Sequence, residues 1–231
     1  MLDVNRKELK YLVQDTEVMR IARQLSAVMS RDKHNTEDGY LVRSLYFDTL
    51  TDRDFEDKVN GYDKRQKIRI RVYHPHDNTA KLELKEKEGN AQRKRSLTIS
   101  REEAERMIDG DYTFLSEKSE PLARYLYSFM ITECYRPKCI VEYDRLAFYT
   151  DTNETRVTFD RRLRATEADF GLFQEKLPLY PVANRAETTM EVKYNGFLFT
   201  YIKNLINTSE QMQVSNSKYC RARMISKRGR F

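Results

Sequence analysis

A run of alternating positive charges lies near the middle of the sequence, in residues 65–71. Its charged members are Arg65, Lys67, Arg69 and Arg71. Alternate side chains of a β-strand share one face, so this segment predicts a strand with cations on one side and Ile68 and Ile70 on the other. Cations stacked in this way repel one another unless an anion or interleaved carboxylates lie among them. The segment therefore predicts a face that binds a polyanion or that holds interleaved carboxylates.

Other segments that are predicted to be strands repeat this alternation of charge. The residues concerned are Arg6, Glu8 and Lys10 near the start, Lys81, Glu83, Lys85 and Lys87 in the middle, and Arg145, Arg156, Glu191 and Lys193 later in the chain. For any one strand, the simpler explanation is the water-exposed face of a half-buried antiparallel sheet. Repetition over several strands favours a sheet that curls shut with its apolar faces outward, so that these side chains line a narrow basic channel containing a few carboxylates.

The hydrophobic periodicity predicts which elements carry these residues. Eight strands are expected at residues 6–13, 41–47, 64–73, 80–87, 92–99, 138–150, 156–164 and 188–194. Helices are expected after an N-cap at Asp15 or Thr16, at 52–59, 101–110, 121–131 and 197–206, with a short segment at 217–224 and a loop at 168–186. The strands are joined by hairpins rather than βαβ units, which favours an α+β fold dominated by an antiparallel sheet.

The composition is that of a folded protein with a basic excess. The 231 residues include 42 Lys and Arg against 36 Asp and Glu, a net charge of +6. A hydrophobic content of 39%, with 15 Tyr and 11 Phe, is too high for a disordered chain. No Gly/Ser/Pro-rich linker or internal repeat divides the sequence, which predicts a single domain over residues 1–231.

The sequence also excludes several classes of site. Cys134, Cys139 and Cys220 lack the spacing of a zinc site or a disulfide framework, so reduced and mostly buried thiols are expected. No stretch approaches the roughly 20 apolar residues of a membrane span, and the N-terminus lacks an apolar leader. These features predict a cytoplasmic protein.

Seven short motifs occur in order along nearly the whole chain. They are Glu8-Leu9-Lys10-Tyr11, Arg69-Ile70-Arg71 followed by Tyr73, Leu82-Glu83-Leu84-Lys85, Tyr143-Asp144-Arg145, Arg156-Val157-Thr158-Phe159-Asp160, Glu191-Val192-Lys193 and Ser217-Lys218-Tyr219. In this order the chain resembles the polyphosphate-polymerase domain of vacuolar transporter chaperone (VTC) proteins, bacterial type, in the CYTH-like superfamily of triphosphate tunnel metalloenzymes. The resemblance implies an eight-stranded antiparallel β-tunnel with helices packed outside.

The resemblance also implies roles for individual residues. Those expected to act on the transferring phosphate are Lys10, Arg69, Arg71, Lys85 and Arg145, and those expected to bind substrate elsewhere are Arg93, Arg156, Lys193, Ser217 and Lys218. Glu191 matches the family's metal-binding glutamate, for Mn²⁺ or Mg²⁺; its alternative is a salt bridge to Lys193 or an arginine. The match around residues 92–95 slides by one, so Arg93 is the expected tunnel residue and Lys94 the surface one. The family's basic residue two positions before Ser217 is replaced by Ser215.

The implied activity is transfer of the γ-phosphate of ATP to a growing polyphosphate chain. Two alternatives stay open: a tunnel triphosphatase or cyclase, with Glu8, Glu83, Glu142 and Glu191 in a metal cage, and a non-catalytic module that binds polyphosphate or triphosphate. Nucleic-acid binding is not expected, because the basic segment from Arg221 to Arg230 has no recognition motif and is interpreted as a solvated end. The expected partners are ATP and inorganic polyphosphate, with a membrane protein as a further candidate.

Overall fold

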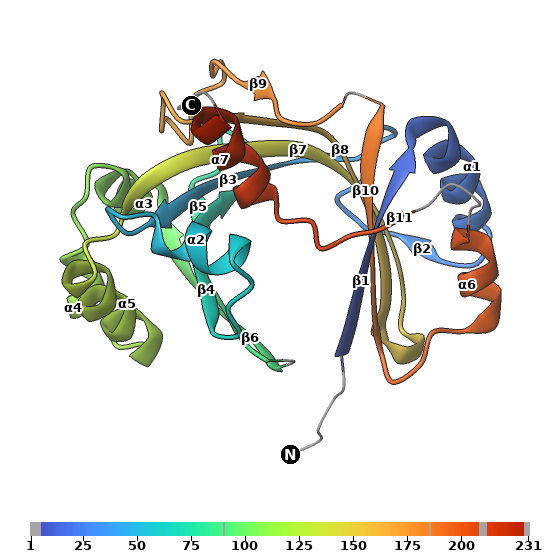
Figure 1. Ribbon diagram of the computed structural model, residues 1–231, viewed down its shortest axis with the longest axis horizontal. Coiled ribbons are helices and arrows are strands. Elements are labelled where there is room, and N and C mark those ends of the chain that lie inside the picture. The colour runs from blue at the N-terminus through green and yellow to red at the C-terminus, as the bar shows by residue number, and fades with distance from the viewer. Residues whose placement is uncertain (1–5, 90, 185, 208–211, 229–231) are drawn as a thin grey trace. The chain divides into compact units, whose positions relative to one another are not determined.

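The computed structural model describes residues 6–89, 91–184, 186–207 and 212–228. These residues form two compact units (Figure 1). Unit 1 comprises Met1–Leu41, Tyr143–Leu163 and Ala183–Ser217, and unit 2 comprises Val42–Glu142, Arg164–Val182 and Lys218–Phe231. The single domain expected from the sequence stays a prediction.

The strands belong to one sheet, and every strand pair with a described register is antiparallel. They are β1 (Arg6–Gln14), β2 (Ser30–Arg31), β3 (Tyr40–Asp48), β4 (Arg65–Val72), β5 (Thr79–Glu88), β6 (Ala91–Ser100), β7 (Arg136–Thr150), β8 (Thr155–Thr166), β9 (Tyr180–Pro181), β10 (Glu187–Asn195) and β11 (Met212–Gln213). The main order is β11-β1-β10-β8-β7-β3-β4-β5-β6. The eight predicted strands are confirmed; β2, β9 and β11, of two residues each, are additional.

The helices lie outside the sheet, as expected for an α+β fold. They are α1 (Asp15–Leu25), α2 (Arg53–Val59), α3 (Arg101–Ile108), α4 (Phe114–Glu117), α5 (Pro121–Thr132), α6 (Thr200–Ile206) and α7 (Lys218–Arg228), with a 3₁₀ turn η1 (Thr152–Glu154). Ser100 forms a capping box with Glu103. The predicted N-cap of α1 is wrong: Gln14 occupies the cap position, and Asp15 instead accepts a hydrogen bond from Thr188 Oγ1 at 2.5 Å. No helix of the described residues is long and apolar enough to cross a membrane.

In unit 1, helices α1 and α6 cover the apolar face of β1, β10 and β8. Ile21 of α1 and Ile202 of α6 are fully buried in one cluster with Met190 and Val192 of β10. Because side chains alternate along β10, the residues next to Met190 and Val192, Glu191 included, point to the opposite face. Burial of the apolar face therefore fixes which charged residues share the other face.

In unit 2, the same division separates the faces of β4, β5 and β6. Ile68, Ile70, Leu82 and Leu84 are fully buried against helices α3 to α5. Their neighbours along β4 and β5 are the predicted cations, which are thereby excluded from the core. The alternation in the sequence thus becomes a two-faced sheet, with an apolar face under the helices and a charged face opposite.

Helix α7 is held to α2 and its flanking residues by buried polar contacts. Tyr219 donates its hydroxyl to Asp48 at 2.6 Å, and Arg223, which is 9% exposed, contacts Asp52 at 2.6 Å and Glu167 at 3.1 Å. Arg223 is therefore buried, and the interpretation of this segment as a solvated end is wrong for it. The sequence did not reveal this because both of its partners lie more than fifty residues away in the chain. Arg230 lies outside the described residues.

Asp54, a buried acid in α2, has a raised pKa. Asp54 accepts the hydroxyl hydrogen of Tyr135 at 2.9 Å, and Tyr135 accepts from Gln66 Nε2 at 2.7 Å. Burial, and then the negative charge of Asp48, raise the pKa of Asp54 to about 8. The folded protein therefore keeps this proton at neutral pH, where the unfolded chain has released it.

This raised pKa makes the stability fall as pH rises from about 4 to about 8, because over that interval the folded state binds the extra proton. The side chain in Asp54→Asn is neutral at every pH. We therefore expect this variant to reduce the fall in the free energy of unfolding with pH by at most about 1.4 kcal/mol per pH unit. Urea unfolding at pH 5 and pH 8 checks it. Equal losses of stability in both proteins would show that Asp54 does not hold a proton in the folded state.

Candidate functional site

The charged face of unit 2 is formed by β3 to β6. Register pairs Lys67 with Lys85, Arg69 with Glu83, and Arg71 with Lys81. Directly opposite residues share a face, so these side chains lie together on the side away from the helices. Among the described residues of β4, β5 and β6, this face has one carboxylate, Glu83, against a larger set of cations: Arg65, Lys67, Arg69, Arg71, Lys81, Lys85, Lys87 and Lys94. We call this set the unit 2 cation face.

Glu83 organises the centre of the unit 2 cation face. Its carboxylate lies 2.7 Å from Arg69 Nε and 3.8 Å from Arg71 Nη2, and it also contacts Lys94 Nζ. Burial alone would raise the pKa of Glu83, but the charges of Arg69 and Arg71 and the hydrogen bond from Lys94 outweigh it and lower the pKa to about 2. Glu83 is therefore ionised, and it separates cations that would otherwise repel one another.

Tyrosine and serine side chains of β3 complete this face. Arg69 Nη1 donates to the Tyr46 hydroxyl at 3.0 Å, and the guanidinium lies 5.7 Å from the ring centre of Tyr46. Arg71, only 8% exposed, approaches Ser44 Oγ at 3.5 Å. These contacts orient both guanidinium groups, and an oriented guanidinium group can bind an oxyanion through two hydrogen bonds.

The register resolves the ambiguity between Arg93 and Lys94. Lys94 pairs with Lys85, whereas Arg93 pairs with Glu86 on the opposite face. Lys94 is exposed, as expected for a surface residue, and the register also puts it on the unit 2 cation face beside Lys85. Arg93 lies near the start of β6, opposite the last residues of β5.

The charged face of unit 1 is formed by β1, β10 and β8. Lys10 pairs with Glu191, and Glu8 pairs with Lys193. Lys10 Nζ lies 2.9 Å from Glu8 and 3.7 Å from Glu191, and Lys193 Nζ lies 2.5 Å from Glu191. Burial would lower the pKa of Lys10, but the charges of Glu191 and Glu8 raise it overall, so the ammonium group stays charged. We call these four residues the unit 1 charge cluster.

Arg145 lies beside this cluster in a rigid setting. Its Nε and Nη2 atoms hold the carboxylate of Asp160 at 2.7 and 2.8 Å, and its guanidinium lies 5.3 Å from the Tyr143 ring centre. Burial would lower the pKa of Arg145, but Asp160 raises it well above its ordinary value. At Gly39 (φ +98°) an added Cβ would lie 2.4 Å from the Arg145 carbonyl oxygen, so only glycine permits this close approach.

The remaining predicted residues lie at the edges of these groups. Arg156 is held by Asp32 at 2.7 Å and by the Tyr40 hydroxyl at 3.1 Å. Ser217 is the last residue of unit 1, and Lys218 begins α7 in unit 2. The predicted residues thus fall into two local groups: Lys10, Arg145, Arg156, Glu191, Lys193 and Ser217 in unit 1, and Arg69, Arg71, Lys85, Arg93 and Lys218 in unit 2.

Glu191 has oxygen-rich surroundings. Thr158, directly opposite Glu191 in the sheet, has a buried Oγ1 atom without a hydrogen-bond partner among the described residues. Asn216 likewise has a buried Oδ1 atom without such a partner, while its Nδ2 donates to Thr189 at 2.8 Å and its carbonyl accepts from Lys10 at 3.3 Å. No group of three His, Cys, Asp or Glu suited to a metal occurs among the described residues.

These donors fit Mg²⁺ or Mn²⁺, which prefer oxygen ligands and often take only one or two carboxylates, with the rest from substrate phosphates and water. Glu191 would supply the carboxylate, and the unsatisfied oxygens of Thr158 and Asn216 would be neutral donors of the same kind. The salt bridge to Lys193, proposed from the sequence as the alternative, is also present.

Glu142 does not belong to either charged face. Its carboxylate lies 2.6 Å from Arg43 and 2.6 Å from Arg164, and both Glu142 and Arg43 are almost fully buried. Arg43 pairs with Val72 of the apolar face of β4. The suggested role of Glu142 in a metal cage is therefore wrong. A sequence signal was present, because Glu142 and Arg145 are three residues apart and so point to opposite faces of one strand.

Several residues of the charged faces were missed by sequence reasoning. Tyr46 and Ser44 carry no charge and therefore gave no signal. Asp160 belongs to the motif at residues 156–160 but had no predicted role, although its two-residue spacing from Thr158 placed it on the same face. Asn216 lies in an irregular segment where no periodicity applies.

Comparison with known families identifies the family of this chain. The chain matches the VTC domain over residues 5–227 and therefore belongs to the VTC domain family. No curated protein matches the chain in sequence. The family relation covers both units and both charged faces.

Solved structures resemble this chain at low sequence identity. A putative adenylyl cyclase from Hippeastrum, described as having a dominant triphosphatase activity, is 14% identical, with 94% of each chain covered and a TM-score of 0.54. A putative adenylate cyclase from Bacillus halodurans is 16% identical, with 87% of each chain covered and a TM-score of 0.49. The first likeness supports the predicted triphosphate tunnel fold class, with more strands than the expected eight.

Proposed function

We propose that the protein is a metal-dependent polyphosphate polymerase, which transfers the γ-phosphate of ATP to the end of a polyphosphate chain. The observation that carries the proposal is the unit 2 cation face, where a single described carboxylate is set among many cations that a polyanion would neutralise. Membership of the VTC domain family supports a polyphosphate-related or triphosphate-related function.

The transfer needs charge neutralisation and alignment rather than a protein nucleophile. A terminal oxygen of the polyphosphate forms a bond to the γ-phosphorus while the bond from that phosphorus to the bridging β-γ oxygen breaks, and ADP leaves. Arg69, Arg71 and Lys85 bind and orient phosphate oxygens on the unit 2 cation face. Lys10 and Arg145 do the same in unit 1, with their orientation set by Glu8 and Asp160.

A divalent metal at Glu191 would neutralise phosphate charge in unit 1. Arg156, Lys193, Ser217 and Lys218 are proposed to bind phosphates that do not react. These roles extend the sequence-based assignment, and Lys94 joins them because it shares a face with Lys85.

A triphosphatase is the second candidate, favoured by the fold shared with the Hippeastrum protein. Incubation of the protein with ATP and Mn²⁺, followed by a gel stained for polyphosphate and an assay of free phosphate, distinguishes the two. An acid-stable polymer supports the polymerase. Free phosphate without polymer would support the triphosphatase, and binding without turnover would leave a polyphosphate-binding module.

Glu191→Gln tests the metal assignment. The substitution keeps the side-chain size and removes the charge, so metal-dependent turnover should fall about 100-fold or more. Polyphosphate binding measured in chelator should be equal or tighter, because a negative charge has been removed from the unit 1 charge cluster. Lys10 retains Glu8 at 2.9 Å, so the melting temperature should change little.

Glu8→Gln is the matched control, because it removes the other carboxylate that contacts Lys10 and Lys193. It should reduce turnover far less than Glu191→Gln. Full activity of the Glu191 variant with an unchanged metal requirement, or equal losses in both variants, would show that Glu191 only partners the lysines.

A further inference from the structure

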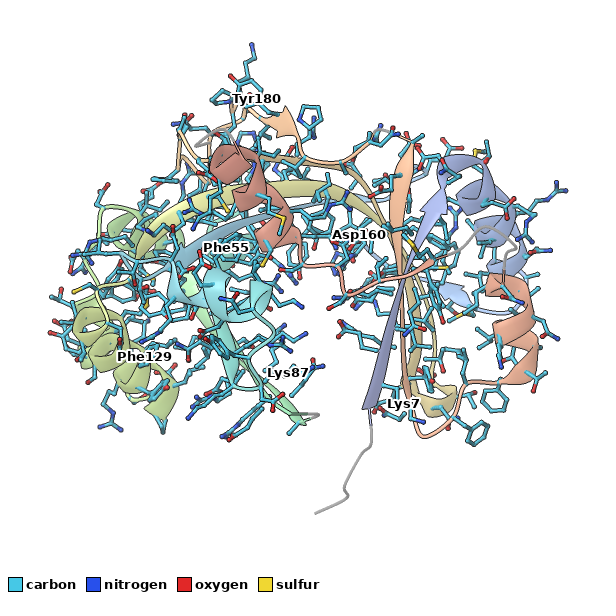
Figure 2. The ribbon with its side chains drawn as sticks, in the orientation of Figure 1. Lys7, Phe55, Lys87, Phe129, Asp160 and Tyr180 are labelled. Atoms are coloured by element: carbon cyan, nitrogen blue, oxygen red, sulfur yellow. The ribbon has the colours of Figure 1, made fainter. Side chains whose placement is uncertain are left out.

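A groove lies in unit 2 where β4 begins, β5 ends and β6 begins. Its volume is about 590 Å³, and it reaches from α5 to the ends of β4, β5 and β6. Figure 2 labels Phe129 on α5 and Lys87 near the end of β5, and both line the groove. The other lining residues that matter here are Lys64, Arg65, Arg93 and Tyr125.

Two of the acids that line the groove are already neutralised. Glu86 is held by Arg95 with hydrogen bonds of 3.0 to 3.2 Å, and Glu133 is held by Arg53 at 2.7 Å. In contrast, no described residue forms an ion pair with any of the remaining groove cations, which are Lys64, Arg65, Lys87 and Arg93. They outnumber the remaining acids, Asp57 and Glu88. The groove therefore carries uncompensated positive charge.

The groove meets the unit 2 cation face at the ends of β4 and β5, while its α5 wall and Gln66, Glu86 and Arg93 lie on the helix-covered side of the sheet. Arg65 pairs with Lys87 in the register, and the next pair on the same face is Lys67 with Lys85. Arg65 and Lys87 are thus both the last pair of the cation face and part of the groove lining. Same-face residues are about 6.6 Å apart along a strand, so cations follow one another at short intervals from Arg69 to the edge of the groove, where a linear chain can turn round the strand ends.

We infer that this groove binds the part of a linear inorganic polyphosphate that extends beyond the phosphates held on the unit 2 cation face. The inference rests on the proposed function and deepens it, because it assigns a chain-length preference to residues outside that face. It also gives Arg93 a place: Arg93 contacts the polymer from the groove rather than from the face of Lys85.

The aromatic residues of the groove argue against nucleic acid as the ligand. Tyr125 and Phe129 stack on each other, with ring centres 5.5 Å apart and an interplanar angle of 8°. The Arg95 guanidinium lies 4.9 Å from the Tyr125 ring centre, and that of Arg53 lies 5.9 Å from the Phe129 ring centre. Single-stranded nucleic acids bind by stacking bases on accessible rings, and these rings already have partners on their faces.

The test compares ligands of two lengths on the double variant Lys64→Gln, Arg93→Gln. Both residues are exposed, so folding should be unaffected, which the melting temperature checks. Calorimetric titration should show about tenfold weaker binding of long-chain polyphosphate, since two charge contacts are lost, and less than about a twofold change for tripolyphosphate. The matched control is Lys176→Gln, which removes an exposed charge of unit 2 outside the groove and should change neither affinity by more than about twofold.

The outcomes separate this inference from the proposed function. If wild-type protein binds both ligands and the double variant retains full affinity for the long chain, the groove is not a polyphosphate site and the proposed function stands. Equal weakening for both lengths would also overturn the inference. If wild-type protein binds neither ligand, the proposed function itself fails. A variant that loses affinity for a single-stranded oligonucleotide but not for polyphosphate would make the groove a nucleic-acid site.

Discussion

Replacing Arg71 with alanine is expected to lower the rate of ATP turnover by about 100- to 1,000-fold, a loss typical of removing one preorganised contact to developing negative charge. The free energy of unfolding should change by less than about 1 kcal/mol, although Arg71 is only 8% exposed. Glu83 keeps Arg69 at 2.7 Å and its contact with Lys94, and the loss of Arg71 removes a cation opposite Lys81.

Steady-state kinetics with ATP and chemical unfolding of the same preparations check this expectation. Arg71→Lys is the companion variant: it retains the charge without the planar fork, so its activity should lie between those of the wild type and the alanine variant. If alanine at position 71 unfolds the protein while affinity for tripolyphosphate is intact, Arg71 is structural.

Replacing Arg43 with alanine should give the opposite result. The substitution leaves the buried Glu142 with only the half-exposed Arg164 and removes the donor to the carbonyl oxygens of Leu172 and Gln174. The expected loss of stability is about 3 kcal/mol, because an underpaired carboxylate and backbone acceptors are left buried. Arg43 and Arg71 belong to neighbouring strands but to opposite faces of the sheet.

The double variant Arg43→Met, Glu142→Met should regain most of this stability, since apolar residues of similar size avoid the cost of burying an unpaired charge. Urea unfolding of the single and double variants measures both effects. At permissive temperature the folded Arg43 variant should retain most of its affinity for tripolyphosphate. If the Arg43 variant is stable but has lost affinity for tripolyphosphate, Arg43 has a role in binding rather than in stability.

The contrast between these two arginines shows where prediction from the sequence works. Arg71 belongs to an alternating run, and alternation in a strand fixes which residues share a face. The charged faces of β4, β5 and β10 were therefore predictable, as was the burial of Ile68, Ile70 and Leu82. Arg43 lies among mostly apolar residues, and nothing in its neighbourhood names Glu142 as its partner.

The sequence alone does not decide which of two adjacent cations points to the charged face of a strand, because that depends on the register of the strand with its neighbour. Arg93 and Lys94 are adjacent cations in one strand, and the sequence favoured Arg93 for the charged face. The hairpin pairs Lys94 with Lys85, and a shift of one residue would have reversed the faces of the whole strand. Register depends on the turn and on burial of Leu97 and Ile99 under the helices, so it is a property of the packed sheet.

The sequence by itself determined the strands, their two faces, the α+β class and the residues whose charge calls for an anionic ligand, because these follow from local periodicity and residue type. Only the tertiary structure decided the partners: Glu83 among its cations, Glu142 with Arg43, and Arg223 with Asp52, which is 171 residues away. Such pairs join segments that are distant in the chain. Their selection depends on which strands and helices pack together, and no local pattern records that choice.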